Sequence, residues 1–322
     1  MDPELAQIVD LRLRLCASPP PSRVGAEALL GRVFGGLLSS ASAVERLEAD
    51  DRLAGVLLVA APQPNRFGAP ESTVSALLDP AVPAAQAWAA QRFESLVGAL
   101  PAHCSLDLRP QDQALAERAR IHGFGVSKLD LVGDVETART RLRDRVGRAR
   151  ADGVQFSPLT AALAEPVSRM VGAFFRENAD LGWGGSPLTE PEQAVIDARE
   201  AAGMRDRLAA GPLTDYVVRR GGALVGHMSC VFHPEHGLYG ASGGMNLFLA
   251  PEVQGLGLGA FAYAHLLARL SELGAKTFFG RTSNPAVIHI GRYLGRRLER
   301  LIMRRDGPFL SADAGAGWSN SG

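Results

Sequence analysis

One segment of the chain combines residue types that can hold an anion through the backbone. It follows a predicted strand that ends two residues before Pro251, and it reads Gln254, Gly255, Leu256, Gly257, Leu258, Gly259, Ala260. Glycine lacks a Cβ atom, so its N–H group can approach a phosphate closely, and the N-terminus of a helix that begins inside the loop adds about half a positive charge. The spacing predicts a phosphate-binding turn between a strand and a helix.

Other glycine-rich phosphate loops fit this segment less well. A P-loop would end in Gly-Lys-Ser/Thr, which is absent here. A dinucleotide-binding GxGxxG loop separates its last two glycines by three positions, whereas Gly257 and Gly259 are two apart, and no βαβ unit with a following acidic residue is evident. The structural alternative is a flexible turn without a ligand, and three alternating glycines ahead of a regular helix disfavour it.

Polar residues on the neighbouring strands are candidates for acid–base chemistry. His227 lies within the predicted strand 223–232; an imidazole titrates near neutral pH, so this residue is either a general base or a hydrogen-bonded histidine of the sheet. Ser242 and Asn246 lie on the strand that leads into the loop, and they either face an acceptor cleft or make structural polar contacts. His233 and His236 fall in a predicted solvated turn with no further ligand nearby, so no metal site is expected.

The loop belongs to the second of two similar sets of predicted elements. In both halves two helical stretches precede a series of strands, a helix, a strand, a second helix and a closing strand. Matching landmarks recur at an offset of 171 or 172 residues in the same order: Pro80 and Pro251, Asp112 and Asn284, Gly123 and Gly295. This agreement indicates an internal duplication.

The first half lacks the glycine loop. The aligned stretch is Pro83-Ala84-Ala85-Gln86-Ala87-Trp88, so side chains stand where bare amides are needed, and Pro83 has no N–H to donate. We therefore expect this half to bind no phosphate-bearing ligand at this position and to serve as a structural partner or as one wall of the substrate cleft.

The second half resembles the GNAT superfamily of acyl-CoA-dependent N-acyltransferases. The stretch from Gln254 to Gly259 matches the family's Gln/Arg-x-x-Gly-x-Gly/Ala motif, and Asn284 followed by Gly295 is similar to its second landmark. The resemblance implies an α/β (α+β) protein of two tandem GNAT-like domains, as in mycothiol synthase, each with a mixed, mostly antiparallel sheet flanked by helices. The expected boundaries are 1–135 for a degenerate copy, 136–310 for the acyl-CoA-binding copy and 311–322 for a flexible tail.

The resemblance also implies roles for individual residues. The backbone of Leu247, Phe248 and Leu249 would pair with the pantetheine arm as an added strand would, and the residues from Gly255 to Ala260 would hold the pyrophosphate. Asn284 would hydrogen-bond the arm or its thiol end. Trp183 either lines the acceptor site, as aromatic residues do in the family, or simply packs.

The catalytic positions depart from the family pattern. The usual tyrosine, seven residues after the asparagine, is Gly291, and the usual glutamate, five residues before it, is Phe279. Tyr293 lies two residues beyond, about 200° further round a helix, and is the remaining tyrosine candidate. Coenzyme A thiolate is an adequate leaving group even without an acid from the protein. The replacement of the usual tyrosine and glutamate therefore weakens the interpretation as an enzyme but does not remove it.

These features together predict an N-acyltransferase that moves an acyl group, acetyl in the simplest case, from acyl-CoA to an amine of a small molecule or peptide by direct attack. The alternatives are an acyl-CoA-binding pseudoenzyme or regulatory protein, and an enzyme for longer acyl chains or carrier-protein thioesters. Lys+Arg and Asp+Glu balance at 34 each in 322 residues, which argues against a nucleic-acid partner. Three scattered cysteines and an N-terminus without a signal-peptide pattern favour a cytoplasmic protein with no membrane segment; the oligomeric state stays open.

Overall fold

The computed structural model describes residues 1–16, 19–64, 70–146, 153–177, 190–210 and 214–305. The expected tail 311–322 and Trp183 lie outside these residues. The first part of the chain has these elements: α1 (Pro3–Arg14), α2 (Arg23–Ser39), β1 (Ala41–Ala49), β2 (Arg52–Ala60), β3 (Gln63–Pro64), β4 (Pro70–Leu78), α3 (Ala84–Val97), β5 (His103–Leu108), α4 (Gln113–Ile121), β6 (Gly125–Asp134) and α5 (Val135–Val146). The second part has β7 (Val154–Pro158), α6 (Ala164–Glu177), α7 (Glu190–Ala210), β8 (Asp215–Arg220), β9 (Ala223–His236), β10 (Gly240–Leu249), α8 (Leu258–Glu272), β11 (Thr277–Thr282), α9 (Pro285–Tyr293) and β12 (Arg297–Arg304).

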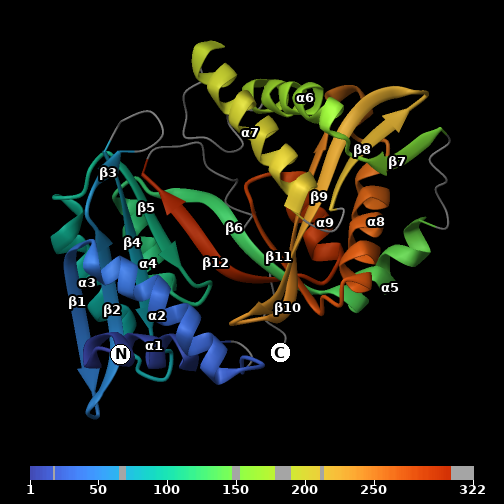
Figure 1. The fold of residues 1–322 in the computed structure, drawn as a ribbon. Helices are drawn as coiled ribbons and strands as arrows, with labels where there is room; N and C mark the ends of the chain where they lie inside the picture. Colours follow the sequence, from blue (N-terminus) through green and yellow to red (C-terminus); the bar gives the residue numbers. More distant parts are fainter. Residues whose placement is uncertain (17–18, 65–69, 147–152, 178–189, 211–213, 306–322) are drawn as a thin grey trace.

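The strands form one 12-stranded sheet that runs through both halves (Figure 1). Its order is β1-β2-β4-β5-β12-β6-β11-β10-β9-β8-β7, with β3 beside β4. Among the described strands only two neighbouring pairs are parallel, β4 with β5 and β10 with β11. The prediction of an α/β protein with a mostly antiparallel sheet flanked by helices is confirmed.

The last strand of each half lies in the other half's part of the sheet. β6 ends the first half but pairs with β11, and β12 ends the second half but pairs with β5; β6 and β12 pair with each other at the centre. Helix α9 contacts the cores of both halves, because Ile288 packs in the core of the first half and Ile290 and Tyr293 pack against that of the second. The domain boundary at 135/136 stays a prediction, and the structure adds that the segments on either side of it are interlocked.

Local sequence accounts for where several elements begin and turn. Asn284 caps α9 by accepting a hydrogen bond from the Ala286 N–H at 2.9 Å, ahead of Pro285 in the first turn. Gly221 and Gly222 adopt positive φ angles in the predicted tight turn between β8 and β9. The expected wide turn at 233–237 is wrong: β9 continues to His236, because His233 and His236 pack against Phe279 instead of facing water.

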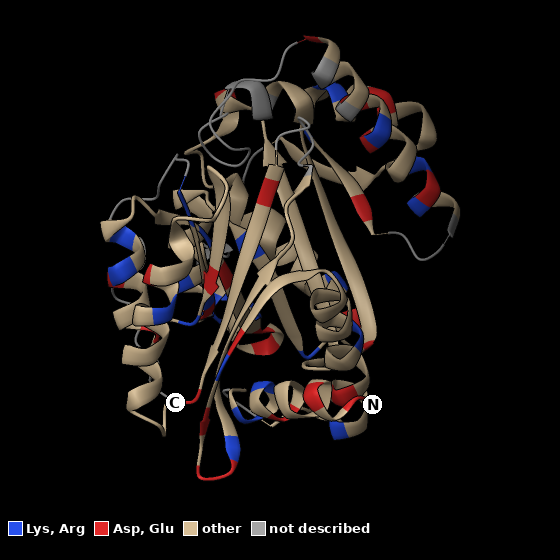
Figure 2. Cartoon of the chain, turned by 90° about the vertical axis from the view of Figure 1, so that its left-hand side faces the viewer, with Lys and Arg blue, Asp and Glu red and all other residues tan. Residues whose placement is uncertain are grey.

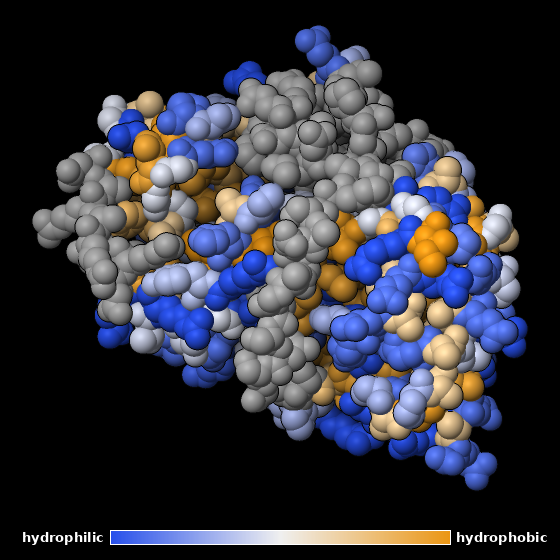
Figure 3. All heavy atoms as spheres, turned by 180° about the vertical axis from the view of Figure 1, so that it is seen from behind, coloured by the Kyte–Doolittle hydropathy of each residue, from blue (hydrophilic) through white to orange (hydrophobic). Residues whose placement is uncertain are grey.

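Apolar cores lie on both faces of the sheet. Strands β8–β10 are covered by α5 and α8 on one face and by α6 and α7 on the other. The tip of the β9–β10 hairpin reaches the first half, where Leu238 packs with the core beneath α1 and α2. Basic and acidic residues are interspersed along the helices in Figure 2, and hydrophobic side chains are interspersed with hydrophilic ones on the face in Figure 3. Within the described ranges, no helix has the length and apolar character of a membrane span.

Candidate active site

The parallel strands β10 and β11 separate soon after they meet. They pair only from Ser242 to Gly244 on β10, opposite 277–279 on β11. Beyond this point β10 continues for five residues with β9 on one side only. The Ala250 N–H bonds to the Val225 carbonyl, so Ala250 directs its backbone groups toward β9. Successive residues of a strand direct these groups to opposite edges. Leu247 and Leu249 therefore direct their N–H and C=O groups to the open edge.

This alternation refines the three residues predicted to hold the donor arm. Phe248 directs its backbone toward β9, where it pairs with His227, so its amide is not on the open edge. The Leu249 carbonyl accepts a hydrogen bond from Gln254 Nε2 at 2.9 Å. That bond explains the value of glutamine at the start of the loop: its side chain ties the loop back onto the strand. Leu247 keeps an edge position available for an extended ligand.

The glycine loop leads into α8 as the sequence predicts. Gly255 and Gly257 have φ angles of 76° and 80°, which side chains other than glycine and asparagine rarely adopt. Gly257 is the N-cap of α8, so the N–H groups of Leu258 and Gly259 have no intrahelical acceptor, whereas the Ala260 N–H bonds to the Gly257 carbonyl at 3.1 Å. A Cβ atom built at Gly255, Gly257 or Gly259 would meet, apart from neighbouring residues of the loop and its helix, no atom of the described residues within 4 Å. The loop therefore borders open space, as the predicted pyrophosphate site requires.

Asn284 lies at the end of β11, on the other side of the gap from β10. Its Oδ1 caps α9, and its own N–H bonds to Thr282 Oγ1 at 3.0 Å. Three residues earlier, Arg281 turns away from the gap and forms a two-pronged ion pair with Asp130 on β6, at 2.7 and 2.9 Å.

The corresponding gap in the first half is filled by its own side chains. Arg109, equivalent to Arg281 by the 172-residue offset, is 6% exposed; its Nη2 donates to the Leu78 carbonyl and, at 3.2 Å, to Asp112 Oδ1. Gln86, from the start of α3, donates to the same carboxylate oxygen at 3.0 Å. Leu78 is the equivalent of Leu249. The edge carbonyl and the gap are both occupied, which supports the expectation that this half holds no coenzyme A.

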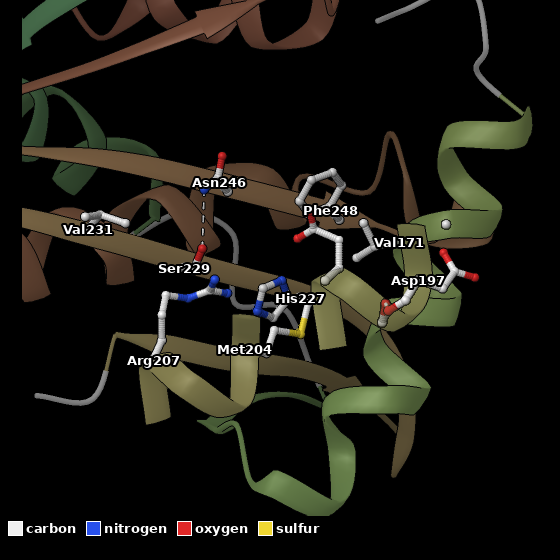
Figure 4. Close-up of a pocket in the computed structure, with 12 residues that line it drawn as sticks. Val171, Asp197, Met204, Arg207, His227, Ser229, Val231, Asn246 and Phe248 are labelled. Carbon is white, nitrogen blue, oxygen red and sulfur yellow. Dashed lines mark hydrogen bonds between the residues drawn. The ribbon is translucent and has the colours of Figure 1, made fainter. Parts of the chain in front are cut away.

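A pocket lies on the α6–α7 side of the sheet, beside β10 (Figure 4). Its volume is about 210 Å³, and it is lined by α6, α7, β9 and β10. The structure brings two of the predicted residues together here, His227 and Asn246, with Asn246 Nδ2 at 3.5 Å from Ser229 Oγ. Apolar side chains of Val171, Met204 and Phe248 share the lining with these polar ones.

His227 is held in one orientation by a buried carboxylate. Its Nε2 lies 3.1 Å from Asp215 Oδ1 on β8, and Asp215 also binds Arg207 of α7, with Nε at 3.2 Å and Nη2 at 2.9 Å. Burial acts to raise the pKa of Asp215, but hydrogen bonds from His227 and Arg207 and the Arg207 charge lower it to about 2. Asp215 is therefore ionised and accepts a hydrogen bond from the Nε2–H of His227. His227 is 2% exposed, and Nδ1 has no hydrogen-bond partner among the described residues.

Three other predicted residues lie elsewhere or are not described. Tyr293 is on the α5–α8 side of the sheet, where its hydroxyl donates to the Arg141 carbonyl at 2.7 Å, so it does not reach the pocket. Ser242 is fully buried at the closed end of the β10–β11 pair and does not line the pocket. Trp183 falls outside the described residues.

Sequence reasoning missed Asp215 and Arg207. An aspartate at the start of a strand and an arginine near the end of a helix are common, and their spacing relative to His227 has no recognisable pattern, so no sequence signal could have selected them. Burial raises the pKa of Cys230 to about 11, which disfavours a thiolate nucleophile there. Within the described part of the chain, no group of three or more His, Cys, Asp or Glu residues is arranged to hold a metal ion.

Comparison with known proteins identifies the segment that carries these features. Residues 183–295 match the model of the Acetyltransferase (GNAT) family. This segment is a GNAT domain. No curated protein sequence matches the chain.

Solved GNAT structures share the fold of both halves together. A GCN5-related N-acetyltransferase from Sphaerobacter thermophilus is 14% identical, with a TM-score of 0.53 over 95% of this chain and 94% of that one. A tandem GNAT protein from the clavulanic acid biosynthesis pathway is 19% identical, with a TM-score of 0.50 over 95% and 96%. A glucosamine N-acetyltransferase region of a fungal multi-domain β-N-acetylglucosaminidase is 14% identical, with a TM-score of 0.48; this chain spans 94% of its own length but 37% of that protein. At these identities the likeness shows the fold alone.

Proposed function

We propose that the chain is an N-acyltransferase that moves an acyl group, acetyl in the simplest case, from acyl-CoA to an amine of a small molecule or peptide. The observation that carries this proposal is the open edge of β10 beyond Gly244, which runs directly into the glycine loop at the start of α8. The same gap in the first half is filled by Arg109, Asp112 and Gln86. One gap of the two is thus suited to an extended, anionic donor.

The donor would be held by backbone groups at both ends. The pantetheine arm carries two amides, which pair with the free edge at Leu247 as an added strand would. Its pyrophosphate would lie against Gly255–Ala260, where the N–H groups of Leu258 and Gly259 at the N-terminus of α8 and the dipole of that helix favour negative charge. Asn284, across the gap, would hydrogen-bond the arm or the thiol end. The acyl-CoA supplies the activated thioester; the protein orients it and leaves the α6–α7 side of β10 for the amine, which attacks in a ternary complex.

The proposal is tested by two measurements on the full chain. Calorimetry should detect binding of coenzyme A and acetyl-CoA, and acetyl-CoA mixed with amines should release free thiol only when an accepted amine is present. If neither heat nor a melting-temperature shift accompanies coenzyme A, the donor assignment is wrong.

An acyl-CoA-binding protein without transferase activity is the second candidate. It is favoured by Phe279 and Gly291, which replace the expected glutamate and tyrosine; Phe279 packs against His233 with ring centroids 5.8 Å apart, and Gly291 is buried. Such a protein would bind coenzyme A yet release no thiol with any amine, including peptides. Competition between short- and long-chain donors would decide whether the transferred group is larger than acetyl.

A further inference from the structure

We propose that the pocket between α6, α7 and the sheet binds a small primary amine that carries no acid group next to its amine, and that His227 Nδ1 takes the proton from that amine. In this proposal Asp215 and Arg207 are positioning residues that act through His227. The inference rests on the proposed acyl transfer and specifies its acceptor and its base.

The orientation of the imidazole follows from Asp215. An ionised carboxylate can only accept hydrogen bonds, so the proton of the neutral ring is on Nε2, 3.1 Å from Asp215 Oδ1. Nδ1 then carries the lone pair. A buried acceptor left without a partner is destabilising, and Nδ1 has none among the described residues. An amine, or a water between the amine and the ring, would satisfy it when the pocket is filled.

Asp215 also prepares the ring to accept a proton. Once Nδ1 is protonated, both ring nitrogens donate, and the carboxylate beside Nε2 stabilises the positive charge. Arg207 holds Asp215 through two hydrogen bonds, and Thr214 Oγ1 adds a third at 3.3 Å. The carboxylate is therefore fixed as well as ionised, so the ring keeps one direction relative to the pocket (Figure 4).

The lining of the pocket indicates the chemical class of the acceptor. Its charged members are Asp197, Glu200 and Arg207, and the Arg207 guanidinium is bonded to Asp215, which does not line the pocket. The lining therefore carries more negative than positive charge, which favours an ammonium group and disfavours a carboxylate. Val171, Met204 and Phe248 provide apolar contact for a short hydrocarbon body. A volume of about 210 Å³ lies below the roughly 300–1,000 Å³ of pockets for drug-sized ligands, which indicates a small acceptor.

The location of His227 suits this role. It is the cross-strand partner of Phe248, and the two rings stack with centroids 6.5 Å apart. The donor arm would lie along the opposite edge of the same strand. The amine would approach from the side of the sheet that carries His227, Ser229 and Asn246.

The proton balance of the step is complete. The bound ammonium gives one proton to Nδ1, and its nitrogen lone pair attacks the thioester carbon. The new C–N bond forms, the carbonyl re-forms and the C–S bond breaks, so the electron pair leaves with sulfur. The nitrogen loses a second proton as the amide forms. One of the two protons neutralises the thiolate and the other goes to solvent, which restores neutral His227.

Two variants test the base and its orientation. His227→Gln should lower kcat/KM for the amine by about 100-fold or more while calorimetry shows unchanged coenzyme A binding. Asp215→Asn should have a similar effect, because an asparagine amide can donate to Nε2 and so move the ring proton to Nδ1. Nitrogen-15 NMR of Asp215→Asn should show the His227 ring proton moved to Nδ1, which a loss of stability alone would not produce. The charged groups around the ring are Asp215 on β8, which bonds it, and Arg207, Asp197 and Glu200 on α7, which line the pocket; the last two are retained in both variants.

Asp112→Asn is the matched control, because Asp112 is also a buried aspartate bonded to an arginine. It should lose stability without a change in kcat/KM. If His227→Gln keeps wild-type kcat/KM, or if all three variants lose activity only in proportion to lost folded protein, His227 is not the base.

The tautomer can be measured on wild type, which removes any dependence on the folding of variants. Nitrogen-15 NMR of histidine-labelled protein should show the neutral His227 ring protonated at Nε2 and bare at Nδ1. A proton on Nδ1 would overturn the proposal, whatever the activity.

The acceptor class is tested with 2-phenylethylamine and phenylalanine, which differ by one carboxylate. 2-Phenylethylamine should be acylated with a kcat/KM at least about tenfold higher and should shift the NMR signals of His227. Equal use of the two compounds, or an amine that leaves the His227 signals unmoved, contradicts the assigned pocket. If coenzyme A does not bind at all, the proposed function fails, whereas a shift of His227 by the amine would still support the pocket.

Discussion

The two parallel strand pairs of this protein, β4–β5 and β10–β11, have the same local arrangement, but the gap is filled in the first pair and open in the second. Both pairs separate at their ends, and both are followed by an arginine and then, three residues later, a helix-capping Asp or Asn position: Arg109 with Asp112, and Arg281 with Asn284. Arg109 enters its gap and bonds the strand carbonyl of Leu78. Arg281 leaves its gap and pairs with Asp130.

The difference depends on which carboxylate each arginine can reach. In the first half Asp112 lies inside the gap, and Gln86 supports it from α3, which begins at Ala84. In the second half the corresponding positions are Asn284 and Gly257, and α8 begins only at Leu258. The earlier start of α3 and the Asp112 carboxylate thus fill the gap of the first half. Gly257 and Asn284 leave the equivalent gap of the second half open. The gap of the first half is filled by bonded side chains, and its strands separate as those of the second half do.

The largest expected effect comes from removing the filling arginine. Arg109→Ala leaves Asp112 buried without its guanidinium, and such a loss typically costs about 3–5 kcal/mol of unfolding free energy. The equivalent change Arg281→Ala breaks a pair whose arginine side chain is 50% exposed, which should cost about 0–1 kcal/mol. Urea denaturation of both variants measures the contrast. Equal losses would show that the two arginines are not in different structural roles.

Placing a charge in the open gap should abolish donor binding. Gly257→Glu puts a carboxylate at the N-terminus of α8, where the pyrophosphate would lie, and coenzyme A affinity should fall roughly 100-fold, or about 2.7 kcal/mol. Gly257→Asn is the control, because asparagine tolerates a positive φ angle and adds no charge; its loss should be smaller. Calorimetry on both variants checks the order, and an undiminished affinity in Gly257→Glu would mean that the donor binds elsewhere.

Asp215 should make the free energy of unfolding depend on pH in the acidic range. Its pKa is lowered from 3.8 to about 2 because the hydrogen bonds from His227 and Arg207 outweigh the opposing effect of burial. The carboxylate therefore stabilises the fold above pH 4, and about 2 kcal/mol is lost as the pH falls from 4 to 2. Urea denaturation between pH 4 and pH 2 should show this decrease in the free energy of unfolding for wild type, and the decrease should be absent from Asp215→Asn. Parallel curves for the two proteins would contradict the ion pair.

The smallest effect on donor binding is expected when Asn284 is replaced by aspartate, the residue at the equivalent position 112 of the first half. Asn284→Asp keeps an oxygen to cap α9 but loses the amide donor and adds a negative charge beside the donor arm. Stability should be unchanged, and coenzyme A affinity should fall roughly tenfold, or about 1.4 kcal/mol. Calorimetry and thermal unfolding measure the two quantities. An unchanged affinity would remove Asn284 from the donor site.

The sequence by itself determined those features whose cause is local. Glycines at 255 and 257 are required by positive φ angles, Asn284 and Pro285 set the start of α9, and Pro83 with its neighbours starts α3 early. These are short-range effects of side-chain volume, missing donors and capping, so the loop, the alternation of strands and helices and the lack of a glycine loop in the first half could be predicted.

Only the tertiary structure decided what depends on residues far apart in the chain. The exchange of β6 and β12 is set by strand pairing between the halves. The extension of β9 past His233 follows from packing on Phe279, and Tyr293 is drawn to Arg141. The His227 ring is held in one orientation because Asp215 bonds it from another strand and Arg207 of α7 holds Asp215. A hydrogen bond needs its partner at about 3 Å, and sequence spacing does not fix such a distance between separate elements.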